Sequence, residues 1–236
     1  MELFKKKNLY QITYRSIRFP MNCFIVEQEN DLIAIDVGAE EFVQVFADIV
    51  EKTGKNISKL LLTHAHDDHA DGLLAFKEAF PEALVGISKR GLPILMGDLS
   101  LQEGESPNKI CGNFPKFTFE ADFTFEDREE IDSLIAVSTH GHTPGSFSFF
   151  MPEEEFLIVG DAFQITGGMA VAGDRRKAFP LPALSTWDLQ LSLESAQRLF
   201  EFKPKLLVCG HGNMLERPGS KMFDAIKRLE KKLADK

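Results

Sequence analysis

A dense run of metal-binding residue types follows two apolar residues in the first half of the chain. After Leu61 and Leu62, residues 64–71 contain three histidines and three aspartates. Such a run contributes little to a hydrophobic core, whereas neutral imidazoles and carboxylates are good ligands for zinc and related divalent ions. The pattern therefore predicts a metal site at the end of a strand, and this constrains the fold more than any other feature.

The spacing within this run indicates how the ligands are shared. Residues two apart in an extended loop point the same way, so His64 and His66 are expected to face one ion. Asp68 and His69 come just past the bend and are expected to face a second ion.

The remaining histidines and two further aspartates stand in short motifs after apolar stretches. The candidates are Asp36 after strand-like 33–35, His140 and His142 in Ser-Thr-His-Gly-His-Thr-Pro-Gly-Ser, Asp161 after apolar 156–159, and His211 in Gly-His-Gly. Their order, with the His-x-His-x-Asp-His run, resembles that of the metallo-β-lactamase fold superfamily. The resemblance covers residues 36–212.

The resemblance implies the fold and the domain organisation. It predicts a mixed α/β (α+β) chain folded as a four-layer αββα sandwich, with two sheets packed face to face and the metals at one edge. Residues 1–236 are expected to form a single domain made of two pseudo-related halves, about 1–115 and 116–236.

The resemblance also implies the ligand set. One ion would be held by His64, His66 and His142, and the other by Asp68, His69 and His211, with Asp161 bridging. Two divalent ions per chain are expected, zinc first, with manganese or iron as alternatives. Asp68 and Asp161 are the expected catalytic carboxylates, and Asp36 is expected to orient the loop or a ligand histidine. His140 is expected behind the ligands or on the surface. A purely structural metal is the alternative, but structural zinc usually has four protein ligands, mainly cysteine or histidine.

The expected reaction is hydrolysis of a small-molecule ester, thioester or lactone by a metal-bound hydroxide. Asp161 argues against β-lactam hydrolysis, since one class of β-lactamases has cysteine or serine there or at the motif aspartate. Residues 212–236 suffice for only one helix, which is less than the helical thiol-binding region of glyoxalase II and argues against that enzyme. Homoserine lactonases have a pocket tyrosine well after the histidine cluster, and the only tyrosines here, Tyr10 and Tyr14, do not match it. The main alternative is a persulfide dioxygenase, with one iron bound by two histidines and an aspartate. A third is a metal-binding protein without turnover.

Composition limits the partners and the cellular location. A hydrophobic fraction of 44% is ample for a core, and a net charge of −9 disfavours nucleic acid, which needs a concentrated basic surface. Cys23, Cys111 and Cys209 are odd in number and widely spaced, which is typical of a reducing cytoplasm rather than a disulfide framework. No signal peptide and no membrane span are expected. The pattern therefore favours a cytoplasmic protein with a small-molecule substrate, and leaves its oligomeric state open.

Hydrophobic periodicity predicts the elements between the motifs. Helices are expected over 40–52, closed by Gly54, and over 70–80, 186–202 and 219–234. Strands are expected over 9–14, 21–26, 31–37, 58–62, 83–88, 117–126, 131–138, 146–151, 156–160 and 205–209.

Two irregular segments are candidates for covering the site. Residues 91–116 are expected to form either a lid or a surface connection with one short helix. Residues 162–186 are the best candidates for substrate contacts, through Arg175 and Arg176, and the alternative is a solvated loop. Asp67 and Asp71 are expected to cap the following helix or to orient ligands.

Overall fold

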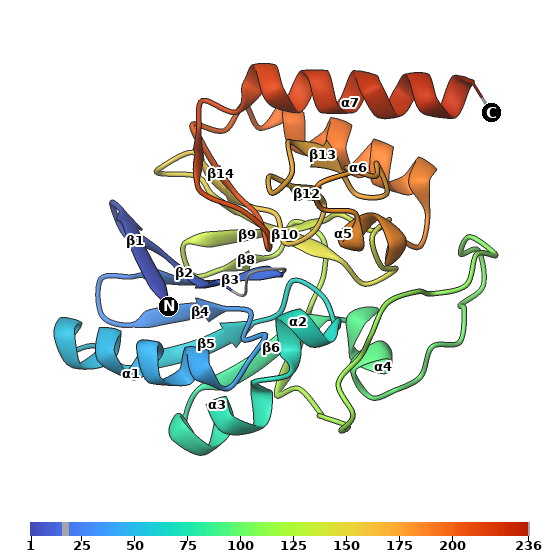
Figure 1. Ribbon diagram of the computed structural model, residues 1–236. Coiled ribbons are helices and arrows are strands. Elements are labelled where there is room, and N and C mark those ends of the chain that lie inside the picture. The colour runs from blue at the N-terminus through green and yellow to red at the C-terminus, as the bar shows by residue number, and fades with distance from the viewer. Residues whose placement is uncertain (16–18, 236) are drawn as a thin grey trace. The chain divides into compact units, whose positions relative to one another are not determined.

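The computed structural model describes residues 1–15 and 19–235, and Figure 1 labels most of its elements. The chain divides into two compact units. Unit 1 comprises Met1–Gly97 and Phe114–Phe125, and unit 2 comprises Asp98–Asn113 and Glu126–Lys236. The boundary between the units is therefore not a single position in the sequence, because residues 98–113 belong to the unit that contains the C-terminal residues. The expectation of one domain with pseudo-related halves stays a prediction.

Unit 1 is built on a seven-stranded mixed sheet in the order β1-β2-β3-β4-β5-β6-β7. Strands β1 to β4 pair antiparallel, and β4 to β7 pair parallel. The strands are β1 Glu2–Lys6, β2 Leu9–Arg15, β3 Pro20–Glu27, β4 Leu32–Ile35, β5 Ile57–Leu61, β6 Leu84–Ser88 and β7 Phe123–Phe125. In parallel strands the carboxyl ends meet at one edge, which brings the residues after β4 and β5 together.

Helices cover one face of this sheet in Figure 1, where α1 and α3 lie on the same side. The unit contains α1 Glu41–Thr53, α2 Asp67–Ala70, α3 Leu73–Ala79 and α4 Gly91–Leu95. Helix α1 buries Phe42, Phe46 and Ile49 at helical spacing, and ends at Gly54, which is left-handed at φ 68° and donates its N–H to the Val50 carbonyl. The prediction for this helix is confirmed to within one residue.

Unit 2 is built on a six-stranded sheet in the order β15-β14-β11-β10-β9-β8, in which β11 and β14 are parallel. A two-stranded sheet, β12-β13, is separate. The strands are β8 Glu130–Ile131, β9 Leu134–Ser138, β10 Phe147–Met151, β11 Phe156–Ile158, β12 Phe163–Gln164, β13 Ala170–Val171, β14 Leu206–Val208 and β15 Leu215–Glu216. The helices are α5 Leu181–Leu184, α6 Leu189–Glu201 and α7 Gly219–Ala234. The apolar sides of α6 and α7 share one buried cluster with β9, β11 and β14.

The boundaries of two predicted helices are wrong for an identifiable reason. The helix expected over 70–80 begins at Asp67 and is interrupted at Gly72. There the Gly72 N–H donates to the Val37 carbonyl at 2.7 Å, and the Val37 N–H donates to the His69 carbonyl at 2.8 Å. These bonds divert backbone groups from the helix. The helix expected from residue 186 begins at Leu189, because Asp188 has an extended backbone (φ −141°, ψ 124°) and caps the helix by accepting the Leu191 N–H.

Several short elements were not predicted: β1, β12, β13, β15 and α5. In contrast, α7 has the bounds expected from its apolar periodicity, 219–234. Within residues 1–15 and 19–235, no helix has the length and apolar character needed to cross a bilayer.

Candidate metal centre

The first group of ligands lies in the loop between β5 and α2 of unit 1. The Asp36 N–H donates to the Leu61 carbonyl at 3.0 Å, which ties the ends of β4 and β5 together. Beyond Leu61, His64 Nε2 and His66 Nδ1 face each other at 3.0 Å. The rings of His64 and His69 lie 4.1 Å apart, and all three histidines are buried. The side chains of His64 and His66 thus come together, as their spacing of two predicts, while their binding of one ion stays a prediction.

A buried carboxylate fixes the orientation of this group. Asp36 Oδ1 accepts the Thr63 N–H at 2.7 Å, and Oδ2 accepts the Thr63 hydroxyl at 2.8 Å. The same Oδ2 lies 2.7 Å from His69 Nδ1. A ligand histidine held through one nitrogen presents the other to the metal. His69 Nε2 is that nitrogen, and it lies 4.0 Å from Asp68 Oδ2.

Thr63 sets the tautomer of a second histidine. Its hydroxyl proton is used by Asp36, so its oxygen accepts from His64 Nδ1 at 3.1 Å. His64 Nε2 then carries the lone pair. Thr63 was not singled out in the sequence, although it lies inside the motif.

The backbone around Asp68 is closely packed. A Cβ added to Gly38 would overlap the Asp68 carbonyl group, so only glycine fits there. Asp67 Oδ1 accepts the Asp68 N–H at 2.9 Å. Burial, and then the charge of Asp68, raise the pKa of Asp67. Asp67 thus orients the ligand loop from inside the first turn of α2, while Asp71 follows that helix and does not start it.

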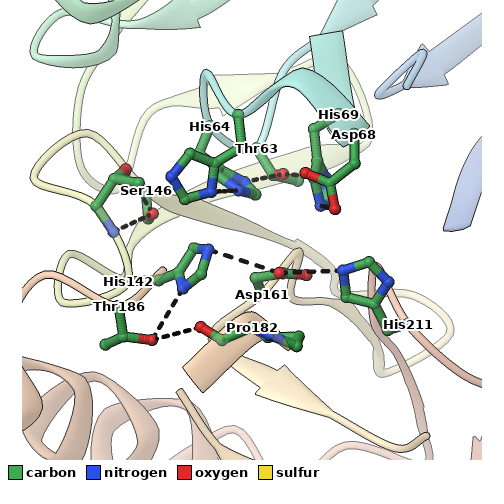
Figure 2. Close-up of polar contacts among 12 residues, drawn as sticks. Thr63, His64, Asp68, His69, His142, Ser146, Asp161, Pro182, Thr186 and His211 are labelled. Atoms are coloured by element: carbon green, nitrogen blue, oxygen red, sulfur yellow. Dashed lines mark hydrogen bonds and ion pairs between the residues drawn. The ribbon is translucent and has the colours of Figure 1, made fainter. Parts of the chain in front are cut away.

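The second group of ligands lies in unit 2, at the ends of three strands. Ile158 of β11 pairs with Val208 of β14 in parallel register, so Asp161 and His211 occupy equivalent positions beyond neighbouring strands. Asp161 Oδ2 lies 3.2 Å from His211 Nε2 and 3.5 Å from His142 Nε2. Figure 2 shows both rings directed at this carboxylate. All three side chains are buried.

His142 is held by a threonine from the segment before α6. Thr186 Oγ1 lies 3.2 Å from His142 Nδ1, and the Thr186 hydroxyl donates to the Pro182 carbonyl at 2.9 Å. The Thr186 oxygen must therefore accept from Nδ1–H, which places the lone pair of His142 on Nε2, the nitrogen directed at Asp161. Phe179 packs on His211, with ring centroids 5.2 Å apart.

These two contacts change the interpretation of segment 162–186. It contacts ligand side chains through Thr186 and Phe179, whereas Arg175 is exposed and Arg176 is directed to the Gly167 carbonyl at 3.5 Å. Substrate contact by either arginine stays a prediction. No local pattern marked Thr186 or Phe179, because their partners lie 44 and 32 positions away in the chain.

His140 and Cys209 lie beside the ligands in sequence but are placed differently. The His140 side chain is exposed, and its Nδ1 lies 2.9 Å from Ser138 Oγ. It thus has the surface position rather than one behind the ligands of unit 2. Cys209 is buried directly after β14, and burial, followed by the charge of Asp161, raises the pKa of its thiol.

The donor sets in both units fit a metal site. Each set combines imidazole nitrogens with carboxylate oxygens, and neighbouring ligand atoms lie 3.0–4.0 Å apart: His64 with His66 and His69 with Asp68 in unit 1, and Asp161 with His142 and His211 in unit 2. Nitrogen and oxygen donors of this kind suit zinc, manganese and iron. Because the ring nitrogens are oriented from behind by Asp36, Thr63 and Thr186, the sets are organised as ligands and not as isolated buried polar groups.

Comparison with known proteins identifies the family. The family model described as the metallo-beta-lactamase superfamily matches residues 17–211. The chain therefore belongs to the metallo-β-lactamase superfamily, whose members are mostly metal-dependent hydrolases. The fold class expected from the motifs is confirmed.

Two relatives and one solved structure show what the chain is similar to. A Bacillus subtilis (strain 168) protein, Uncharacterized protein YobT, is 39% identical over 98% of this chain and 100% of its own length. Hydroxyacylglutathione hydrolase from Bartonella henselae (strain ATCC 49882 / DSM 28221 / CCUG 30454 / Houston 1) is 25% identical over 75% of this chain and 56% of its own. The solved structure of a metallo-beta-lactamase from Pontibacter korlensis superposes with a TM-score of 0.74 at 20% identity, covering 97% of this chain and 98% of its own. That last likeness concerns the fold alone.

Proposed function

We propose that the chain is a dinuclear metal-dependent hydrolase acting on an ester, thioester or lactone bond of a small molecule. The observation that carries this proposal is the position of Asp161 Oδ2, 3.5 Å from His142 Nε2 and 3.2 Å from His211 Nε2. A carboxylate directed at two histidines is suited to bridging two ions. The two histidines would then serve different ions.

The proposed assignment combines the ligands of the two units. His64, His66 and His142 would hold one ion, and Asp68, His69 and His211 the other, with Asp161 bridging. Seven ligands exceed the four of a closed structural zinc, so open positions for substrate and water would remain. Zinc is the first candidate, and manganese or iron would also suit these donors.

When bound, such a pair of ions lowers the pKa of water to near neutrality and polarises a carbonyl oxygen. The chain's own residues supply the rest. Asp36 and Thr186 hold His69 and His142 with Nε2 as the ligand atom. The Asp68 side chain keeps 16% of its surface exposed, so it can take a proton from water and pass it to the leaving group.

The substrate class is supported by chemistry and by one relative. The name of the hydroxyacylglutathione hydrolase indicates action on a thioester. Carbonyl polarisation serves esters and lactones equally. A small-molecule substrate, without nucleic acid or membrane partners, and a cytoplasmic location are part of the proposal.

The test is metal content measured together with activity. Protein purified without chelator or added metal should contain about two zinc or manganese ions per chain and should hydrolyse at least one member of an ester, thioester and lactone panel. Asp161→Asn should lose metal and nearly all activity. Asp224→Asn makes the same chemical change on exposed α7 and should retain both.

Two results would overturn the proposal. About one iron per chain, with oxygen consumption on persulfides, would replace hydrolysis by dioxygenase chemistry. Full activity in Asp161→Asn would exclude the bridging role.

A further inference from the structure

Segment 98–113 of unit 2 is attached to the start of α6 by side chains. These residues form neither helix nor strand, and most are exposed. The Ser106 hydroxyl donates to Asp188 Oδ2 at 2.6 Å, and the Asn108 amide donates to the same oxygen at 3.0 Å. The indole N–H of Trp187 donates to the Asn108 carbonyl at 2.8 Å. Two adjacent residues thus anchor a segment about 80 positions away.

The same two residues hold the loop that carries His142. The Trp187 N–H donates to the His142 carbonyl at 2.9 Å, and the Asp188 N–H donates to the Gly141 carbonyl at 2.8 Å. A Cβ on Gly141, where φ is +143°, would overlap the backbone of Ser192. The loop is therefore packed directly against α6. Any shift of Trp187 and Asp188 would move the backbone of a metal-ligand histidine.

The Asp188 carboxylate divides its two oxygens between these tasks. Oδ1 accepts the Leu191 N–H at 2.9 Å and caps α6, while Oδ2 receives the two donors from segment 98–113. Burial raises the pKa of Asp188, but hydrogen bonds, first from Ser106 and then from Leu191, outweigh it and leave the pKa below its usual range. The group is thus an ionised acceptor at neutral pH, which strengthens each bond.

We propose that the Trp187–Asp188 pair couples the docking of segment 98–113 to the position of His142, so that docking and metal binding strengthen each other. The inference rests on the proposed function, because it takes His142 as a metal ligand. Linkage makes the effect reciprocal: if docking favours the metal-binding position of His142, bound metal must favour docking by the same factor. Trp187 and Asp188 are positioning residues in this scheme.

One substitution separates the two tasks of Asp188. Asp188→Asn keeps an oxygen for the Leu191 N–H, and asparagine is as good an N-cap as aspartate. Its NH₂ group would face the Asn108 amide donor, which then has no acceptor, and the bond with Ser106 would have to reverse and would lose its charged acceptor. Ser106→Ala removes one bond from the other side without altering α6. Glu103→Gln makes a carboxylate-to-amide change at an exposed position of the same segment and serves as the control.

Three measurements follow docking and metal binding separately. Hydrogen exchange of residues 98–113, with and without zinc, reports docking. Chelator competition reports zinc affinity. Trp187 is the only tryptophan of the chain and is buried, so its emission reports its own environment.

In the wild type, zinc should slow exchange over 98–113. Asp188→Asn should speed exchange without zinc, shift Trp187 emission to longer wavelength and weaken zinc binding about fivefold to tenfold. Ser106→Ala should change the exchange rate, the Trp187 emission and the zinc affinity in the same directions but to a smaller extent. Glu103→Gln should match the wild type in all three measurements.

The outcomes distinguish this inference from the proposed function. Faster exchange with wild-type zinc affinity in both Asp188→Asn and Ser106→Ala would overturn the coupling alone. Unchanged exchange in both variants would overturn the docking contact. A wild-type chain that binds no zinc, manganese or iron would refute the proposed function, and the coupling would fall with it. If Asp188→Asn does not fold, Ser106→Ala decides, since it lies outside every helix and strand.

Discussion

Asp36 holds His69, a proposed metal ligand, through buried hydrogen bonds but is not itself one of the proposed ligands. Its two oxygens are used by Thr63 and His69, and its backbone is left-handed at φ 59°, an uncommon conformation for a residue other than glycine. Asp36 is thus fixed by Thr63, by His69 and by its own backbone conformation. Because it is not a proposed ligand, it can affect a bound metal only through His69.

Asp36→Asn is therefore expected to weaken zinc binding by about 10-fold to 100-fold. The amide can satisfy Thr63 or His69 with its remaining oxygen but lacks the charge that raises the basicity of the imidazole. Chelator competition measures the change. Asp48→Asn, on the exposed side of α1, is the matched control, and equal zinc affinity in the two variants would contradict the positioning role.

Gly38 and Gly219 provide a contrasting pair. At Gly38 a Cβ would overlap the Asp68 carbonyl, whereas around Gly219, the first residue of α7, the space is open. Gly38→Ala should cost about 1–3 kcal/mol in the free energy of unfolding and should also weaken metal binding, because Asp68 must move. Gly219→Ala should be neutral or slightly stabilising. Denaturant unfolding measures the stability of both variants. Equal stability of the two would show that the loop carrying Asp68 can shift to accommodate the added methyl group.

The ligand residues could be predicted from the sequence, but their supports could not. His64, His66, Asp68 and His69 lie in one short run, so a local pattern identifies them. Thr186 supports His142 from 44 positions away, and its role depends on the path of the intervening chain. The surface position of His140 likewise depends on how the chain turns after β9, and the local sequence does not specify that turn.

At the scale of elements, the edge strand β1 is held by polar contacts more than by burial. Its residues alternate little in hydrophobicity and are mostly exposed, which is why periodicity did not reveal it. Lys5 of β1 contacts Glu27 of β3 at 2.9 Å and Tyr10 of β2 at 2.6 Å, and Lys55 contacts Glu27 at 3.0 Å. The Tyr10 hydroxyl donates to Glu27 at 3.1 Å, so a single carboxylate links β1, β2 and β3.

The same carboxylate predicts a pH dependence. Hydrogen bonds from Lys5, then Lys55, lower the pKa of Glu27 to about 2. A depressed folded-state pKa gives stability that is present above the unfolded value near 4.5 and is lost as pH falls towards 2. Because the group is partly exposed, Glu27→Gln should cost only about 1 kcal/mol at pH 7. Denaturant unfolding at pH 7 and pH 3 should show this difference shrink at the lower pH, and a constant difference would contradict it.

Element boundaries depend on tertiary hydrogen bonds more than on periodicity. Helix α7 begins directly after Pro218, whose carbonyl accepts the Met222 N–H at 2.9 Å, and its predicted bounds agree with the structure. Helix α6 starts three residues later than its apolar pattern indicates, since Asp188 is extended (φ −141°, ψ 124°) and caps the helix while its N–H and that of Trp187 bond to the His142 loop. The displaced boundary is a consequence of building the site.

At the scale of the whole molecule, the order of residues along the chain conceals which segments belong together. Segment 98–113 interrupts unit 1 in sequence but belongs to unit 2, where Ser106 and Asn108 bond to Asp188. Its irregular composition allowed a lid to be suggested but gave no indication of its attachment. The family relationship fixes the fold, and the attachments within each unit give this chain its particular site.

Metal should link the stability of the two units, because the proposed ligand sets draw on both. Zinc at about 100 times its dissociation constant should add about 2.7 kcal/mol to the free energy of unfolding. For a chain of this length that corresponds to a rise in Tm of roughly 5–10 °C. Circular dichroism follows the whole chain, whereas Trp187 emission follows unit 2. Both midpoints should rise together with zinc and fall together with a chelator.

Asp161→Asn should abolish this shift, and Asp224→Asn should preserve it. A rise confined to the Trp187 signal would place the metal on unit 2 ligands alone, such as His142, Asp161 and His211. Two histidines and one carboxylate are the ligand set of many non-haem iron oxygenases, so that outcome would also favour iron over zinc. The thermal experiment thus separates one shared centre from a site within one unit, and with it hydrolysis from oxygen chemistry.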